Sequence, residues 1–189
     1  MKLDYYLPHY DFFSRHRILI NSTPDIIFNA IQNLNFNQSQ IIRCLLTVRK
    51  AYAVLGFDKS SWSVEKSVFN KKIIESGFTV LDYLPGREIV LGFAGQFWKP
   101  SGGFINFSNQ EEYLAYTATN ACKGAWNFYL SETGQGTLEL STETRVFCPE
   151  KAVKQKFGLY WLFIKPFSGL IRKVLLKNIK HIAERSNQV

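Results

Sequence analysis

The stretch from Glu150 to Arg185 carries the most regular hydrophobic pattern in the chain. Pro149 precedes it, and the carboxylate of Glu150 suits the first turn of a helix. Pro166 lies inside the pattern and removes a backbone donor, which predicts a kink or break near 163–165. Apolar and aromatic side chains recur at spacings of three and four, as on one side of a helix: Phe157, Tyr160, Trp161, Ile164, Ile171, Leu175, Ile179 and Ile182.

Earlier in the chain the hydrophobic period changes to two, which is typical of strands. The turn residues Pro85 and Gly86 predict a hairpin between two of these strands, and a Gly-containing turn over 132–136 predicts another. Consecutive hairpins indicate an antiparallel sheet. The predicted strands cover 13–21, 78–84, 88–95, 104–107, 123–130 and 137–147.

Helix signals follow the first strand. Ser22 or Thr23 can cap a helix whose first turn holds Pro24 and Asp25, and a second short helix is predicted from about Ser39. A further short helix is expected over 64–75, within a stretch, 49–76, that gives the least clear pattern, and a helical turn over 110–116, with Ser108 or Asn109 as its cap. Residues 1–11 and 186–189 are expected to be irregular.

This order of elements predicts one α+β domain over residues 1–189, with a core from about 13 to 184. The expected architecture is a helix-grip arrangement, in which a curved antiparallel sheet wraps around the long C-terminal helix and two short helices follow the first strand. A curved sheet of this kind leaves a gap beneath the helix, which is a natural cavity for an apolar ligand.

The segments GFTVLDYLPGREIVLGFAGQFWKP, KGAWNFYL, LSTETRVF and FGLYWLFIKPFSGLIRKVLL resemble an uncharacterised bacterial branch of the START-like superfamily, also called SRPBCC or Bet v 1-like. The resemblance covers roughly Phe13 to Glu184. It implies the helix-grip fold and a hydrophobic ligand cavity between the sheet and the long helix. It supplies no catalytic residues, because this superfamily includes carriers, receptors, cyclases and oxygenase domains on one fold.

Composition adds a large supply of aromatic residues, with sixteen Phe, nine Tyr and four Trp. They suit either a dense core or an aromatic-lined pocket. The net charge is +8, and the stretch 150–189 supplies most of it, with nine Lys or Arg against two Glu. A solvated helix face is the simplest interpretation. Binding to a membrane surface is the alternative, and no motif indicates nucleic acid.

Three widely spaced cysteines, Cys44, Cys122 and Cys148, predict no disulfide framework, and the latter two suit small core positions. No ligand spacing indicates a metal site, and no cofactor is expected. The N-terminal residues lack the apolar run of a signal peptide, and no apolar stretch approaches a membrane span, so a cytoplasmic location is expected.

Glu143 and Arg145 are the most informative polar residues, because they lie two apart on a predicted strand and share one face. If that face is turned outward, they form a surface pair of little energetic value. If it is turned inward, they are charges in a cavity, paired and available for chemistry. Arg172 on the long helix is a possible third member, through Glu143 or Glu88, or a tie between helix and sheet.

Large apolar side chains are the other candidates for lining a cavity, with a solid aromatic core as the alternative interpretation. These candidates are Trp98, Trp126, Tyr160, Trp161 and Ile164.

Three functional hypotheses follow. The first is a non-enzymatic module that binds a small hydrophobic or amphipathic molecule, lipid or polyketide-like, under the long helix. The second is an enzyme of the cyclase or hydrolase kind, using Glu143 with Arg145 or Arg172. The third is a protein that binds a membrane surface or a partner through its basic C-terminal helix.

Overall fold

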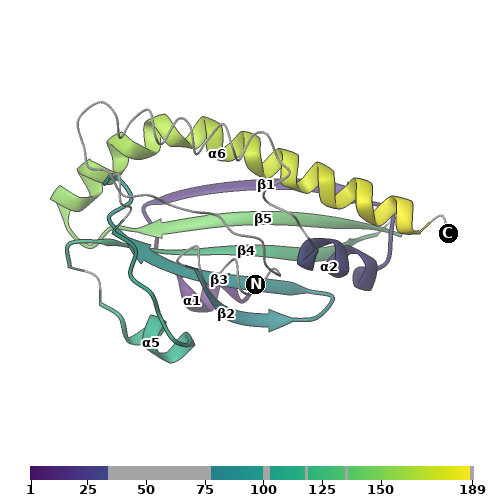
Figure 1. The fold of residues 1–189 in the computed structure, drawn as a ribbon, viewed down its shortest axis with the longest axis horizontal. Coiled ribbons are helices and arrows are strands. Elements are labelled where there is room, and N and C mark those ends of the chain that lie inside the picture. Colours follow the sequence, from purple (N-terminus) through teal and green to yellow (C-terminus); the bar gives the residue numbers. More distant parts are fainter. Residues whose placement is uncertain (34–77, 100–102, 118, 135, 188–189) are drawn as a thin grey trace.

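The computed structural model describes residues 1–33, 78–99, 103–117, 119–134 and 136–187. Five strands form one antiparallel sheet in the order β1-β5-β4-β3-β2, with the long helix α6 across one face (Figure 1). The strands are β1 (Phe12–Ile20), β2 (Thr79–Leu84), β3 (Glu88–Gly95), β4 (Cys122–Thr133) and β5 (Thr137–Phe147). The helices are α1 (Leu3–Tyr6), α2 (Pro24–Gln32), α5 (Gln110–Ala115) and α6 (Lys151–Ser186).

The hairpins form where turn residues permit them. Gly86 has φ +70°, a backbone conformation that only glycine adopts without strain, and it closes the turn between β2 and β3. The first strand closes the other edge of the sheet, since Phe12 pairs with Val146 and Ile20 with Leu138. The prediction of an α+β helix-grip arrangement is thereby confirmed.

Helix α6 runs without a break through Pro166. A kink or break was expected near 163–165: the break does not occur, and the helix is bent along its length (Figure 1). A proline in mid-helix costs one backbone hydrogen bond, and the long apolar contact of α6 with the sheet can offset that cost.

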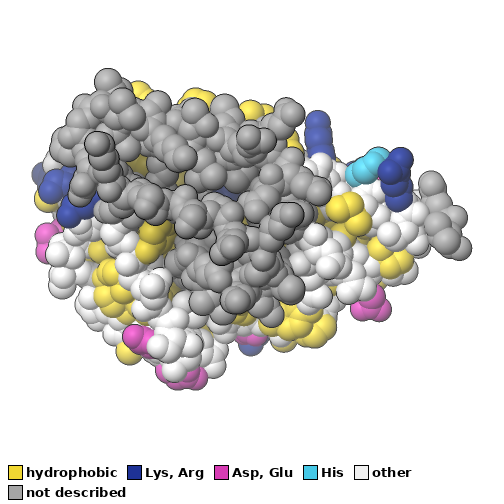
Figure 2. All heavy atoms as spheres, in the orientation of Figure 1, with side chains coloured by type: hydrophobic (Ala, Val, Ile, Leu, Met, Phe, Trp, Pro, Cys, Tyr) yellow, Lys and Arg dark blue, Asp and Glu magenta, His cyan; other side chains and the backbone are white. Residues whose placement is uncertain are grey.

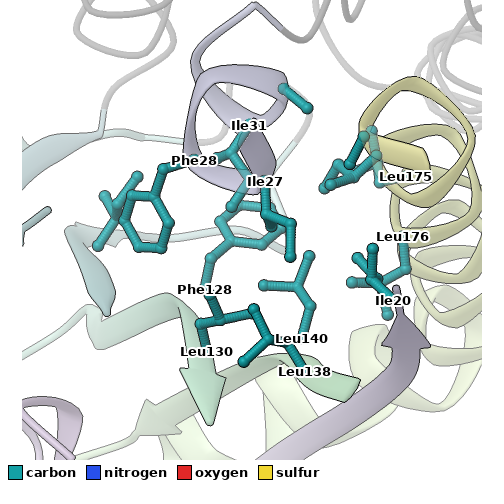
Figure 3. Close-up of a cluster of buried hydrophobic side chains, with 14 of the residues drawn as sticks. Ile20, Ile27, Phe28, Ile31, Phe128, Leu130, Leu138, Leu140, Leu175 and Leu176 are labelled. Atoms are coloured by element: carbon teal, nitrogen blue, oxygen red, sulfur yellow. The ribbon is translucent and has the colours of Figure 1, made fainter. Parts of the chain in front are cut away.

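The main apolar core lies between the sheet, α2 and the C-terminal half of α6. Figure 3 shows Phe128, Leu130 and Leu140 of the sheet pointing toward Ile27 of α2, with Leu176 of α6 beside them. Side chains at the centre of this cluster are fully buried. The helix α2 is fixed by the cap that the sequence predicted, because the Thr23 side chain accepts a hydrogen bond from the Ile26 N–H.

The opposite face of the sheet is also covered. The buried Leu3 and Tyr6 of α1 and Tyr113 of α5 pack there against Val90 and Ala125. The expectation that residues 1–11 are irregular is therefore corrected at α1. Four helical residues carry no readable period, and what positions them is burial against the sheet rather than helix propensity.

Other differences are local. The strand expected over 104–107 is reduced to a single bridge between Ala94 and Ile105, and the helical turn near 110 is α5, capped by Asn109. The helices expected from Ser39 and over 64–75 lie outside the described residues.

Candidate functional site

Aromatic side chains fill the interface between the N-terminal half of α6 and the sheet. We call Phe12, Phe78, Phe93, Phe97, Trp126, Phe157 and Trp161 the aromatic cluster. Its rings touch in series: the Phe78 centroid lies 5.8 Å from that of Trp126, and Phe157 stacks on Trp161 at 5.6 Å. Phe157 is buried, but Trp126 and Trp161 are only partly buried. Part of the surface of Trp126 and Trp161 therefore remains accessible at this end of the interface.

A row of polar residues crosses the same interface beside these rings. We call Ser14, His16, Trp126, Thr142, Thr144, Ser168 and Arg172 the polar strip. The strand register explains it, because Ser14 pairs with Thr144, and Thr144 in turn with Trp126. The apolar cluster around Phe128 lies on one side of this strip and the aromatic cluster on the other.

The polar strip is incompletely hydrogen-bonded within the described residues. Trp126 Nε1 donates to Thr142 Oγ1 at 2.6 Å, and the Thr142 hydroxyl donates to the Asn127 carbonyl at 2.9 Å. In contrast, Thr144 Oγ1 is buried with no hydrogen-bond partner in the described part of the chain. An unpaired buried hydroxyl is costly, so this position calls for an explanation.

Arg172 reaches from α6 toward the sheet, with its guanidinium carbon 5.1 Å from the centre of the Trp126 ring. Its Nε donates to Ser168 Oγ at 3.4 Å. Part of the residue is accessible to solvent, but Nη1 is fully buried and has no partner among the described residues. Burial lowers the pKa of Arg172 to about 10, which still leaves the side chain charged at neutral pH.

His16 lies directly under α6. A Cβ atom at Gly169 would stand 3.3 Å from His16 Nε2, so the glycine lets the helix approach the imidazole closely. Burial, followed by the charges of Arg172 and Lys173, lowers the pKa of His16 below its ordinary value. The ring is therefore neutral at pH 7, and Arg172 is the charged member of the strip.

Glu143 and Arg145 lie on the other face of the sheet, beneath α1. Arg145 Nε contacts Glu143 Oε1 at 2.7 Å, and Arg145 Nη2 contacts Asp4 at 2.8 Å. The guanidinium also donates to the Leu7 carbonyl at 3.3 Å and lies over the Tyr10 ring. Burial alone would lower the pKa of Arg145, but its hydrogen bonds to the two carboxylates raise it. This pair is a structural connection between α1 and β5.

Neighbouring polar groups extend the same connection. Asn127 accepts from the Glu143 N–H at 3.0 Å and donates to Glu88 Oε1 at 2.7 Å. The other Glu88 oxygen accepts from the Lys2 N–H at 2.7 Å. All these side chains are buried and satisfied, which is how a polar network in a core becomes stabilising.

The structure divides the candidate residues between the two faces. Trp98, Trp126, Tyr160 and Trp161 are partly buried against the apolar cluster that includes Phe157. Ile164 is half-buried on α6, and Arg172 lies in the polar strip. Glu143 and Arg145 are not with them, and the expected pairing of Arg172 with Glu143 or Glu88 is not made in the described structure.

The sequence interpretation missed the buried Thr144 and the role of His16. Thr142 and Thr144 alternate with Glu143 and Arg145, so both faces of β5 carry polar groups, and both are buried. A period of two cannot tell which face is covered by α6 when neither is apolar throughout. The available signal was the apolar pair Leu140 and Val146, which lies on the same face as the threonines.

Cys122 and Cys148 form a pair that the sequence also did not indicate. Both are buried, and their Sγ atoms lie 2.9 Å apart. The hydrogen bond between them, and then burial, raise the pKa of Cys122. The Cys122 thiol is therefore protonated in the folded protein, which makes it a weak nucleophile.

A pocket of about 330 Å³ lies away from the candidate residues, between Pro24 of α2, the β2–β3 turn and β4. Within the described ranges no group of three or more His, Cys, Asp or Glu residues could hold a metal ion. In the same part of the chain no helix has the length and apolarity needed to cross a bilayer.

Comparison with known proteins gives distant structural similarities. No protein-family model matches this chain, and neither does any curated protein. The solution structure of the Aha1 dimer from Colwellia psychrerythraea is 12% identical, covering 92% of this chain and 97% of that one, with a TM-score of 0.41. The hypothetical protein jhp0584 from Helicobacter pylori is 6% identical, covering 92% of this chain and 89% of that one, with a TM-score of 0.40.

A third similar structure is the protein MLL2253 from Mesorhizobium loti, which is 13% identical and covers 93% of this chain and 98% of that one at a TM-score of 0.37. The fold described above rests on this chain's own strand order and packing. The resemblance to the START-like superfamily stays a prediction.

Proposed function

We propose that this protein binds a small hydrophobic or amphipathic molecule between the sheet and α6. The observation that carries the proposal is the aromatic cluster, where rings from β1, β3, β4 and α6 gather but Trp126 and Trp161 stay partly uncovered. A ligand pocket is typically lined by apolar and aromatic side chains with a few polar groups, and the polar strip beside these rings supplies such groups. The ligand class is consistent with the predicted START-like resemblance.

A neutral fluorescent probe tests this proposal. N-phenyl-1-naphthylamine is expected to bind in a saturable 1:1 manner and to be displaced by dodecanol. Trp161→Ala removes the ring that stacks on Phe157, and it is expected to weaken probe binding about tenfold. Tyr83→Ala is the matched control, because Tyr83 is an exposed aromatic residue of β2, away from α6. Absence of saturable binding to the wild-type protein would refute the proposal.

An enzymatic function for Glu143 and Arg145 receives no support from their geometry. Both charges have partners inside the protein, and α1 covers them. A general acid or base must reach its substrate within hydrogen-bond distance, directly or through one water. We therefore propose no catalytic role for this pair.

A second candidate function is binding to an anionic membrane surface, and one observation favours it. Helix α6 exposes an apolar stripe at Leu159 (67% exposed), Leu162 (68%), Phe163 (64%) and Leu170 (51%). Hydrophobic side chains are visible along the upper edge of Figure 2, where α6 runs in Figure 1. Dark blue Lys and Arg side chains lie toward both ends of that edge. Apolar and basic groups together suit the interface of an anionic bilayer.

Vesicle sedimentation tests this second candidate. Vesicles of phosphatidylglycerol and phosphatidylcholine are expected to bind the protein, with binding weakened by salt, whereas vesicles of phosphatidylcholine alone bind less. Leu162→Gln is expected to reduce binding, and Tyr83→Gln, an exposed residue outside the stripe, to leave it unchanged. Equal binding to both kinds of vesicle would count against a membrane role.

A further inference from the structure

We propose that Arg172 and Thr144 hold the carboxylate of a long-chain monocarboxylic ligand, whose apolar tail lies along the aromatic cluster. This inference rests on the proposed function, and it names the chemical class of the ligand and the residues that select it.

The charge of Arg172 has no carboxylate partner among the described residues. Its Nη1 is buried and lacks a hydrogen-bond partner among the described residues, and no described carboxylate forms an ion pair with it. An uncompensated charge taken out of water is strongly unfavourable. Binding of an anion that pairs with this guanidinium would therefore stabilise the folded protein.

The Trp126 ring orients the guanidinium of Arg172. Trp126 lies 5.1 Å from the guanidinium carbon, and its indole is held in turn by the hydrogen bond to Thr142. Stacking on a fixed ring orients the planar guanidinium. Arg172 is thus pre-positioned over the sheet, which lowers the entropic cost of binding an oxyanion.

The hydroxyl of Thr144 is a second hydrogen-bond donor in the polar strip. Thr144 is the cross-strand partner of Trp126, so the two side chains are neighbours on the same face of the sheet. That hydroxyl is buried and unpaired in the described structure, like Nη1 of Arg172. One carboxylate oxygen bound by the guanidinium and one by the hydroxyl would satisfy both groups.

The charge balance favours a monoanion. His16 is the nearest other titratable group of the strip, and the lowered pKa of its imidazole leaves it neutral at pH 7. Among the described residues of the polar strip, Arg172 is therefore the charged one. A carboxylate matches one charge, whereas a phosphate monoester would bring close to two charges into the same buried place.

The apolar chain of the ligand is inferred from the aromatic rings that surround Trp126. The same ring that faces Arg172 touches Phe78 at 5.8 Å and Phe128 at 5.1 Å between ring centroids. The polar strip therefore passes directly into apolar aromatic surface. A ligand with an acidic head and an apolar chain is complementary to this succession of groups.

Displacement of N-phenyl-1-naphthylamine by three matched compounds tests the inference: dodecanoate, dodecanol and dodecyl phosphate, each below its solubility limit. The wild-type protein is expected to bind dodecanoate about tenfold or more tightly than dodecanol. Equal affinity of the two overturns the inference while leaving the proposed function intact. Tighter binding of dodecyl phosphate than of dodecanoate overturns the assignment of a carboxylate. If no compound binds, the proposed function falls and this inference with it.

Arg172→Met keeps the length of the side chain and removes its charge. The variant is expected to bind dodecanoate and dodecanol with equal affinity. Lys173→Met is the matched control, since it removes the same charge from the neighbouring exposed position and is expected to keep the preference. A preference retained by Arg172→Met overturns the inference.

The ligand-free stability of the same variant separates a binding role from a structural one. Removal of an unpaired buried charge is expected to raise the Tm of the ligand-free protein, whereas loss of a structural tie would lower it. Thr144→Val provides a second variant of nearly the same shape. It is expected to weaken dodecanoate binding about fivefold. An unchanged affinity for dodecanoate contradicts the assignment of Thr144.

Discussion

Two arginines on opposite faces of the sheet differ in whether their charges are compensated by carboxylates. Arg145 contacts Glu143 and Asp4 and donates to the Leu7 carbonyl, so its burial is compensated. Arg172 contacts Ser168 and the Trp126 ring and has no carboxylate partner in the described structure. The same residue type therefore stabilises the fold at one position and, by our proposal, is reserved for a ligand at the other.

Substitution of Arg145 tests the first of these roles. Arg145→Leu leaves the buried Glu143 with the longer contact to Arg15, at 3.8 Å, and we expect a loss of about 3 kcal/mol in the free energy of unfolding, measured in urea. Arg17→Leu is the matched control, because Arg17 is 73% exposed and pairs with Glu139 at 3.5 Å. An exposed pair contributes less than about 1 kcal/mol. Losses of equal size would contradict the assignment of Arg145 as a buried structural tie.

The lowered pKa of His16 gives a pH dependence with a definite sign. Between its value in the folded protein and its ordinary value of 6.5, the unfolded chain binds more protons than the native state. The free energy of unfolding therefore falls as pH decreases below about 6.5, and this contribution is constant above it.

His16→Gln is expected to flatten the pH dependence of stability between about pH 7 and pH 5. Urea denaturation at closely spaced pH values measures the slope, with His181→Gln, the same change at an exposed position of α6, as the control. A slope that is unchanged in His16→Gln would show that another group is responsible.

At the scale of the elements, regular periodicity made the architecture predictable. The apolar residues of α6 and the alternation in β5 indicate their structure because each element is long enough to repeat its pattern. The short helix α1 was not predictable, since four residues cannot display a period and their order comes from contacts with distant strands. The same limit applies to Cys122 and Cys148, which the β4–β5 pairing brings together over a separation of 26 residues.

The candidate site was predictable only in part, for a related reason. The aromatic positions of α6 followed from spacing, but the unpaired Arg172 is one of nine basic residues in the stretch 150–189. A basic helix face is ordinarily solvated, so no local feature marks Arg172 as the residue that lies over the Trp126 ring. The ligand-binding role that we propose for Arg172 rests on its burial and on the absence of a described partner. Both are properties of packing.

The docking of α1 yields a prediction at this scale. Leu3 is fully buried, whereas Tyr5 on the same helix is 66% exposed. Leu3→Ala is expected to cost about 2–4 kcal/mol of unfolding free energy, because a cavity is left against the sheet. Tyr5→Ala is expected to cost less than about 0.5 kcal/mol. Chemical denaturation measures both, and similar losses would show that α1 does not contribute to the core.

At the scale of the whole molecule, the paired thiols should report on global opening. Cys122 and Cys148 lie at one end of β4 and β5, in the interior of the sheet beside Phe157. Their alkylation by iodoacetamide, followed by mass spectrometry of each peptide, is expected to be at least about tenfold slower in the native protein than in urea. Rapid labelling of either thiol in native buffer would mean that this end of the sheet opens locally.

The pairing of β1 with β5 also bears on how the chain is made. A strand at residues 12–20 has its hydrogen-bonding neighbour at residues 137–147, and α1 rests on polar groups drawn from three strands that are synthesised later. Both segments leave the ribosome long before their partners exist. Until β5 has emerged, the β1 segment lacks its hydrogen-bonding partner, and pairing of this edge is a late step of folding.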